Sequence, residues 1–125
     1  MPTLIDTSAW IEWLIGSPAG KRVGARIPSR EEWVVPTIIQ LELAKWLTRE
    51  ISEDKADSVI AFTQTCMVSD LTTTIALSAA DLCRVHKLAI ADAVVYATAL
   101  AVGAELVTCD QHFNKLPGVT YIPKR

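Results

Sequence analysis

The chain has 125 residues, of which half are hydrophobic, and its formal net charge is −2. This length suits one domain, residues 1–125, and the apolar content excludes a disordered chain. The longest apolar run is about half as long as the ~20 residues that cross a membrane, so we expect no membrane span. An acid at position 6 argues against a signal peptide. Three cysteines without a CxxC spacing are typical of reduced thiols in a cytoplasmic protein.

Short apolar segments alternate with amphipathic patterns along the chain. Strands are predicted at 2–5, 33–35, 67–68, 106–107 and 119–122. Helices are predicted at 8–15, 18–26, 37–50, 52–66, 72–87 and 92–102. The last of these helices is almost wholly apolar, which predicts that it is buried. This alternation is typical of an α/β fold with a mainly parallel sheet of four to five short strands.

Four acidic residues occupy positions that such a fold brings to one edge of the sheet. Asp6 and Asp110 each end a predicted strand. Asp92 opens the helix before the strand that Asp110 ends, and Glu42 lies early in the helix after the second strand. Because a helix runs antiparallel to the strand that follows it, its first turn lies at the carboxyl edge, where open α/β sheets place their sites. We therefore expect the four carboxylates to converge.

Each of these acids also has an ordinary interpretation as a cap, a complement to a helix dipole or a solvated side chain. Together, however, they would repel one another and raise their pKa values unless a cation neutralised them. Carboxylate ligands favour Mg²⁺ or Mn²⁺ over Zn²⁺, and we expect neither His86 nor His112 to join them. A site of this kind binds a phosphate and activates water, which is the chemistry of phosphodiester hydrolysis.

Four motifs carry a resemblance to a known family. They are LIDTSAW at 4–10, the isolated Glu42, LAIADAVVYATAL at 88–100 and LVTCDQHF at 106–113. In the order and spacing of these motifs the chain resembles PIN-domain ribonucleases, most closely the VapC toxins of bacterial type II toxin–antitoxin pairs. The resemblance implies a PIN-like three-layer sandwich. It also implies a metal-dependent endoribonuclease that hydrolyses RNA phosphodiester bonds with Mg²⁺ or Mn²⁺ and an activated water.

The resemblance further implies a role for each residue of the site. Asp6 and Asp92 would bind the metal directly, and Asp110 would complete the site as a ligand or through water. Glu42 would orient or deprotonate the attacking water, or bind the metal through water. Two hydroxyl residues match positions that support the acids: Ser8 and Thr108. Ser8 is interpreted equally well as an ordinary hydroxyl at the start of a helix.

Basic residues are the candidate contacts to RNA phosphates. Four of the 14 acidic residues belong to the site, so the 12 Lys and Arg outnumber the remaining 10. Lys45 and Arg49 lie one turn apart on the helix that carries Glu42, and we predict that they contact the RNA backbone. Further candidates are Lys21, Arg22, Arg26, Arg30, Lys124 and Arg125. Each of these residues also has the ordinary interpretation of a solvated surface charge.

Three tryptophans are a second unusual feature: Trp10, Trp13 and Trp46. They either fill the core or line an apolar groove for a partner, because aromatic residues are favoured at interfaces. The resemblance implies two protein partners, a second copy of the chain in a homodimer and a small cognate antitoxin. The antitoxin would lay a helix in the groove and direct a basic side chain toward the acids.

Other α/β classes place an Asp at the end of the first strand, but they fit poorly here. A receiver domain needs a second acid beside Asp6 and a late lysine, and a haloacid-dehalogenase-like phosphatase needs DxDxT. A catalytically silent PIN-like module that binds RNA or a partner protein remains the alternative. The four intact acids favour the enzyme, because a binding module gains nothing from a self-repelling cluster.

Overall fold

The computed structural model describes residues 1–125. Its strands are β1 (Thr3–Ile5), β2 (Trp33–Pro36), β3 (Met67–Ser69), β4 (Glu105–Thr108) and β5 (Val119–Tyr121). Its α-helices are α1 (Thr7–Ile15), α2 (Pro18–Gly24), α3 (Thr37–Glu50), α4 (Glu53–Thr63), α5 (Thr73–His86) and α6 (Ile90–Val102). Two short 3₁₀ helices complete the chain: η1 (Arg30–Glu32) and η2 (Gln111–Phe113).

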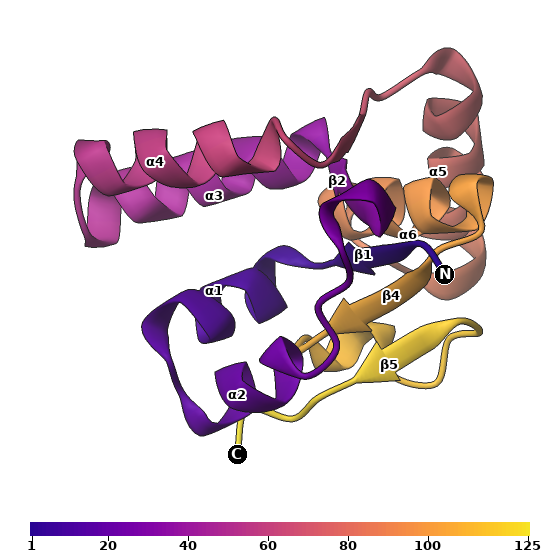
Figure 1. The fold of residues 1–125 in the computed structure, drawn as a ribbon. Helices are drawn as coiled ribbons and strands as arrows, with labels where there is room; N and C mark the ends of the chain where they lie inside the picture. Colours follow the sequence, from indigo (N-terminus) through magenta and orange to yellow (C-terminus); the bar gives the residue numbers. More distant parts are fainter.

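The five strands form one parallel sheet in the order β3-β2-β1-β4-β5 (Figure 1). Strands β1 and β4 lie at its centre, with Leu4 opposite Leu106 and Ile5 opposite Val107. All four of these side chains are buried, as expected for a parallel sheet that helices cover on both faces. The predicted α/β sandwich with a parallel sheet of short strands is therefore confirmed.

The helices pack in pairs around this sheet. Figure 1 shows α3 beside α4, α1 beside α2, and α5 beside α6. Helix α6 is buried at every residue from Ala93 to Ala99, as its apolar sequence predicts. No single helix is long and apolar enough to cross a membrane, and α5 and α6 reach that length and composition only as a pair bent by 116°.

Some element boundaries differ from the predicted ones for local reasons. Helix α4 ends at Thr63 rather than at 66, because the next residues form a tight turn in which the Cys66 N–H donates to the Thr63 carbonyl. Helix α6 begins at Ile90, so Asp92 lies within its first turn instead of at its start. Neither 3₁₀ helix was predicted, because single short turns carry no apolar periodicity.

Candidate active site

The neighbouring strands β1 and β4 bring two of the predicted acids to one edge of the sheet. Asp6 directly follows β1, and Asp110 lies two residues beyond β4. The Asp6 N–H donates to the Val107 carbonyl over 2.9 Å, which continues the strand pairing by one residue. This register sets Asp6 beside Thr108, the last residue of β4. The two strand ends therefore converge as parallel neighbours should.

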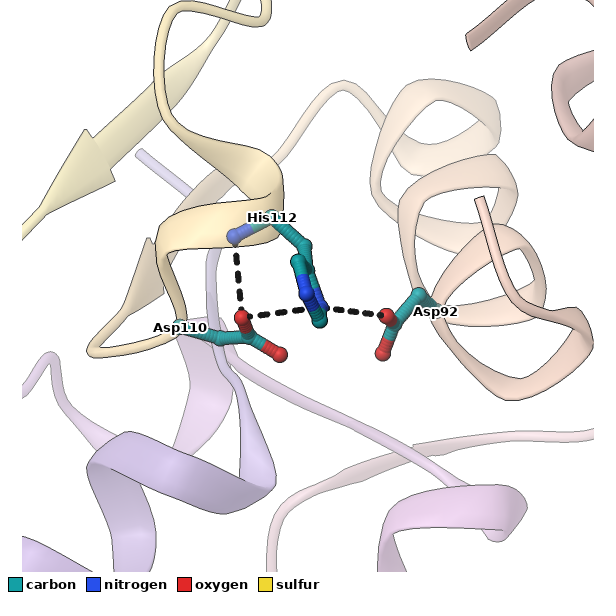
Figure 2. Close-up of side chains that lie close together, drawn as sticks. All are labelled: Asp92, Asp110 and His112. Carbon is teal, nitrogen blue, oxygen red and sulfur yellow. Dashed lines mark hydrogen bonds and ion pairs between the residues drawn. The ribbon is translucent and has the colours of Figure 1, made fainter. Parts of the chain in front are cut away.

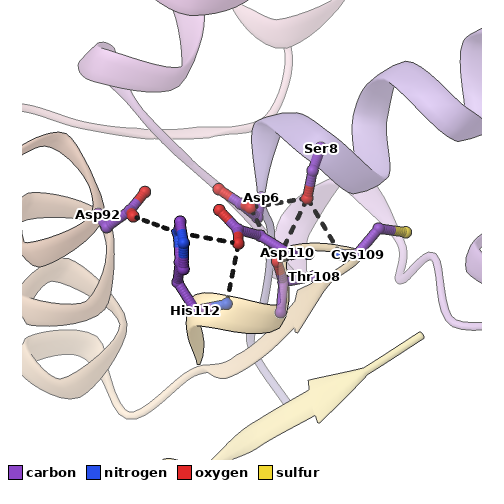
Figure 3. A network of polar contacts seen from close by, with 7 residues as sticks. All are labelled: Asp6, Ser8, Asp92, Thr108, Cys109, Asp110 and His112. Carbon is purple, nitrogen blue, oxygen red and sulfur yellow. Dashed lines mark hydrogen bonds and ion pairs between the residues drawn. The ribbon is translucent and has the colours of Figure 1, made fainter. Parts of the chain in front are cut away.

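Two hydroxyls hold the Asp6 carboxylate in place (Figure 3). Thr108 Oγ1 donates to Asp6 Oδ2 over 2.8 Å, and Ser8 Oγ donates to the same oxygen over 2.9 Å. Each hydroxyl also accepts a backbone hydrogen bond, Thr108 from the Asp110 N–H over 2.9 Å and Ser8 from the Cys109 N–H over 3.0 Å. Both hydroxyl residues singled out in the sequence thus link the first acid to the backbone that carries the last.

A histidine lies between the other two aspartates (Figure 2). His112 Nδ1 is 3.2 Å from Asp110 Oδ1 and 3.8 Å from Asp92 Oδ2. One ligand atom from each of these three residues lies within 4.8 Å of the other two. The Asp110 carboxylate also accepts the His112 N–H over 2.9 Å and so caps η2.

The expectation that His112 stands apart from the acids is therefore wrong. The physical reason is the 3₁₀ turn after β4, which folds the imidazole back over the strand end. The signal in the sequence was the short spacing between Asp110 and His112, because a capped turn at a strand end brings residues i and i+2 together.

Glu42 approaches the same site from α3. It lies in the second turn of that helix, and the Thr7 hydroxyl donates to its Oε1 over 2.6 Å. Thr7 directly follows Asp6 at the start of α1. The hydrogen bond from Thr7 to Glu42 was not predicted, although the run Asp6-Thr7-Ser8 offers two hydroxyls beside an acid. Burial raises the pKa of both Asp6 and Asp92, and the negative charge of Glu42 adds a smaller rise to each.

Burial and mutual repulsion perturb the acids that the site brings together. Burial raises the pKa of the Asp6 carboxyl from 3.8 to about 6, against the opposing effect of its hydrogen bonds from Thr108 and Ser8. The negative charge of Asp92 adds to this rise. Burial, and then the charge of Asp110, also raise the pKa of Asp92. These shifts are the ones expected of carboxylates that share one site.

The donor set fits a divalent cation. None of the four acids forms an ion pair with a lysine or arginine, and His112 is the only basic side chain that contacts them. The available donors are therefore carboxylate oxygens and one imidazole nitrogen. Carboxylate oxygens suit Mg²⁺ and Mn²⁺, and an imidazole is also a good ligand for transition metals. A bound cation would offset the burial and the repulsion that raise the pKa of Asp6.

The predicted RNA contacts lie on the exposed face of α3. Lys45 is exposed one turn beyond Glu42 and makes no ion pair. Arg49 is exposed near the end of the helix, where its Nε lies 2.7 Å from a carboxylate oxygen of Glu50. The structure thus leaves Lys45 free for a phosphate and gives Arg49 a partner within the chain.

An apolar hollow of 120 Å³ lies between α1 and α4, lined by Trp10, Trp13, Leu14, Ser58, Val59 and Phe62. Trp10 is 1% exposed and stacks on Trp33 with ring centroids 4.6 Å apart, so it belongs mainly to the core. Trp13 is partly exposed and meets Trp10 edge to face at 5.7 Å. Trp46, the third residue of the predicted groove, does not line the hollow. Trp10 thus fits the core interpretation and Trp13 lines an apolar hollow, while a role of this hollow in partner binding stays a prediction.

The family profile of the PIN domain matches residues 3–119. The chain belongs to the PIN-domain family. This membership agrees with the five-stranded parallel sheet and with the acids at its carboxyl edge. The comparison with curated proteins gives no significant match.

Solved structures similar to this PIN domain include several from toxin–antitoxin systems. A toxin–antitoxin complex from Klebsiella pneumoniae matches with a TM-score of 0.81 and 24% identity over 94% of this chain and 95% of that chain. DNA-bound VapBC from Salmonella typhimurium matches with a TM-score of 0.71 and 18% identity over the whole of both chains. VapC20 from Mycobacterium tuberculosis, named as a toxin that cleaves the sarcin–ricin loop, matches with a TM-score of 0.69 and 19% identity over 86% of this chain and 87% of that chain. At these identities the likeness establishes a shared fold.

Proposed function

We propose that this PIN-domain protein is a metal-dependent endoribonuclease and the toxin of a toxin–antitoxin pair. The observation that carries the proposal is that Asp92 and Asp110 lie within reach of one cation at the edge of the sheet, with Asp6 linked to Asp110 through Thr108. None of the three has a lysine or arginine partner. Nucleases that hydrolyse phosphodiesters with divalent cations use sites of this composition. The fold shared with a toxin named for cleaving the sarcin–ricin loop is consistent with the proposal.

In this proposal each acid has a separate task. Asp6 and Asp92 bind the cation directly, and Asp110 completes the site as a ligand or through water. Glu42 orients the attacking water or takes its proton. Thr108 and Ser8 orient the Asp6 carboxylate through their hydrogen bonds. Thr7 does the same for Glu42.

Mg²⁺ or Mn²⁺ is the proposed cofactor. A divalent cation held by these carboxylates would lower the pKa of a water and offset the negative charge that develops on the phosphate. The buried Asp6 gains most from such a cation, because burial and two neighbouring carboxylates disfavour its charged form. The chain itself contributes the fixed orientation of the oxygens and the position of Glu42, which orients the attacking water, takes its proton or binds the cation through water.

The proposed protein partners are a small antitoxin and a second copy of the chain. The hollow lined by Trp13, Leu14 and Phe62 offers the antitoxin an apolar seat between α1 and α4. Several structural neighbours come from toxin–antitoxin assemblies, which supports a partner of this class. A catalytically silent module that binds RNA or protein through the same surfaces is the alternative function.

Cleavage of total cellular RNA by the purified chain tests the proposal. We expect discrete fragments with Mg²⁺ or Mn²⁺, no fragments with EDTA, and none from Asp6→Ala or Asp92→Ala. Asp57→Ala removes an exposed acid on α4 and is the matched control, which should cleave like the wild type. Full activity of either site variant would refute the assignment, and a folded protein that neither cleaves RNA nor binds metal would favour the silent module.

A further inference from the structure

Asp92, Asp110 and His112, which we call the acid cluster, lie between two polar hollows. The larger one, which we call the tail hollow, has a volume of 510 Å³ and is lined in part by Gln111, Tyr121, Lys124 and Arg125. The smaller one, the α6 hollow, has a volume of 300 Å³ and is lined in part by His86, Lys87 and Asp92. Both volumes fall within or at the edge of the ~300–1,000 Å³ typical of small-ligand sites.

One side chain separates the two hollows. His112 lines both of them, and it also contacts the two aspartates of the cluster. Asp110 belongs to the tail hollow and Asp92 to the α6 hollow. A chain molecule that extends from one hollow into the other would therefore pass His112 and the two aspartates beside it.

Resting on the proposed nuclease function, we infer that the two hollows hold the nucleotides on either side of the scissile phosphate of a single-stranded RNA. The strand would run from the C-terminal tail, over His112 and the acid cluster, to the start of α6. The inference thus assigns a path and two nucleotide subsites to the substrate. It also assigns RNA contacts to Lys124, Arg125 and Lys87, in addition to the contacts predicted for α3.

The tail hollow carries the three kinds of group that bind a single-stranded nucleotide. Lys124 and Arg125 supply positive charge for a phosphate. The Tyr121 ring offers a surface on which a base can stack, and the Gln111 amide offers both a donor and an acceptor for a base edge. Few apolar side chains line this hollow, which disfavours an apolar peptide as its occupant.

The tail that forms this hollow is held in place by α2. Arg22 Nη2 donates to the Pro123 carbonyl over 2.6 Å and to the Arg125 carbonyl over 3.1 Å. These bonds fix the backbone of the tail and leave the side chains of Lys124 and Arg125 unpaired. Arg22 is therefore a positioning residue in this inference, because it holds the backbone that carries Lys124 and Arg125.

The α6 hollow supplies positive charge on the opposite side of the cluster. Lys87 is the C-cap of α5, with φ 57°, and it makes no ion pair. His86 precedes it in the last turn of α5. Lysine and arginine side chains thus line the hollows on both sides of the acids, where each would neutralise a phosphate of the same strand.

Binding of a fluorescein-labelled single-stranded RNA of mixed sequence, measured by anisotropy in Mg²⁺, tests the inference. An Asp6→Asn background is used to prevent cleavage. Lys55→Gln, at an exposed lysine on α4, is the charge-matched control for Lys87→Gln and a surface-charge control for the double variant. We expect Lys124→Gln/Arg125→Gln and Lys87→Gln to reduce the slope of log Kd against log salt by about 0.7 for each RNA phosphate that the variant no longer neutralises. Arg22→Gln should weaken binding in the same direction, whereas the control should leave the slope unchanged.

A second measurement assigns the stacking role to one side of the cut. Tyr121→Leu should weaken binding about 5- to 150-fold. An RNA with an abasic residue on one side of the cleaved bond should lose the same factor, and the two changes together should cost no more than either alone. An abasic residue on the other side should add its effect to that of Tyr121→Leu.

The outcomes separate this inference from the proposed function. If the wild type cleaves RNA but the tail and Lys87 variants bind with the slope of the Lys55→Gln control, the two-hollow path is wrong and the nuclease stands. If those variants weaken antitoxin binding and leave RNA binding intact, the hollows are a protein interface and the inference is again wrong. If the wild type neither binds nor cleaves RNA, the proposed function and the inference both fall.

Discussion

Thr108 Oγ1 donates to Asp6 Oδ2 over 2.8 Å, although the two residues are 102 positions apart in the chain. The same hydroxyl accepts the Asp110 N–H over 2.9 Å. One fully buried side chain therefore sets both the orientation of the first acid and the backbone of the last. The parallel pairing of β1 with β4 creates this link.

Replacing Thr108 with valine keeps the shape of the side chain and removes its hydroxyl. The Asp6 carboxylate loses a donor and the Asp110 N–H loses an acceptor in a buried setting, so we expect Thr108→Val to lower the free energy of unfolding by about 1–3 kcal/mol. The pKa of Asp6 should rise further, because this hydrogen bond favours its charged form. Urea unfolding in EDTA from pH 4 to 8 measures both effects. The variant should also bind Mn²⁺ more weakly, because the Asp6 carboxylate loses its orientation, and the stabilisation by added Mn²⁺ measures this loss.

Thr98→Val is the matched control for this change. Thr98 is also buried, but its hydroxyl donates to the Val94 carbonyl within α6 and is remote from the acids in the hydrogen-bond network. The control should leave Mn²⁺ affinity unchanged. Equal loss of Mn²⁺ affinity in both variants would show that Thr108 has no special role in positioning Asp6.

The raised pKa of Asp6 predicts a pH-dependent stability in the absence of metal. Because this pKa rises from 3.8 to about 6 on folding, the folded chain binds more protons than the unfolded chain between these pH values. The free energy of unfolding should therefore fall as pH rises through this window, by a total of about 3 kcal/mol from this group.

Asp6→Asn should abolish most of that fall and stabilise the metal-free protein at pH 7.5. Thermal unfolding in EDTA from pH 4 to 8 is the measurement, and Asp57→Asn on the surface of α4 should follow the wild type. Addition of Mg²⁺ should stabilise the wild type by mass action and the variant much less. A wild-type profile that is flat or rises through the window would contradict the prediction.

The contacts of His112 predict an effect on the choice of metal. An imidazole is a better ligand for Mn²⁺ than for Mg²⁺, which prefers oxygen. His112→Ala should therefore weaken Mn²⁺ binding by about 10-fold or more and weaken Mg²⁺ binding much less. Isothermal titration of each metal gives both affinities. Asp110→Asn is the comparison, since loss of an oxygen ligand should weaken the binding of both metals. An identical pattern of affinities in the two variants would show that His112 is not a metal ligand.

The hollow between α1 and α4 predicts a separation of partner binding from catalysis. Trp13 is partly exposed in this hollow. Trp13→Ala should weaken the affinity for the cognate antitoxin by about 10-fold or more, as expected for a buried aromatic anchor. RNA cleavage by the free toxin should change little. Leu77 is an exposed apolar residue of α5 outside the hollow, so Leu77→Ala controls for loss of apolar surface. Unchanged antitoxin affinity in Trp13→Ala would exclude this docking site.

Much of the fold and of the candidate site was readable from the sequence. Apolar patterns identified all five strands and six α-helices, because the residues of an element that face the core recur at a fixed spacing. The convergence of Asp6 and Asp110 was predictable from their places at strand ends, because parallel strands share one carboxyl edge. Ser8 and Thr108 were identified as supports only through their positions in family motifs.

Only the tertiary structure decided which of these local features touch one another. The order β3-β2-β1-β4-β5 sets Asp6 beside Thr108, and a single 3₁₀ turn folds His112 over Asp110. The same packing buries Trp10 against Trp33 while Trp13 keeps an exposed edge. Local patterns record how a residue relates to its chain neighbours and to the core. Contacts between distant segments depend on how the covered sheet and its helices pack as a whole, and no local periodicity specifies that arrangement.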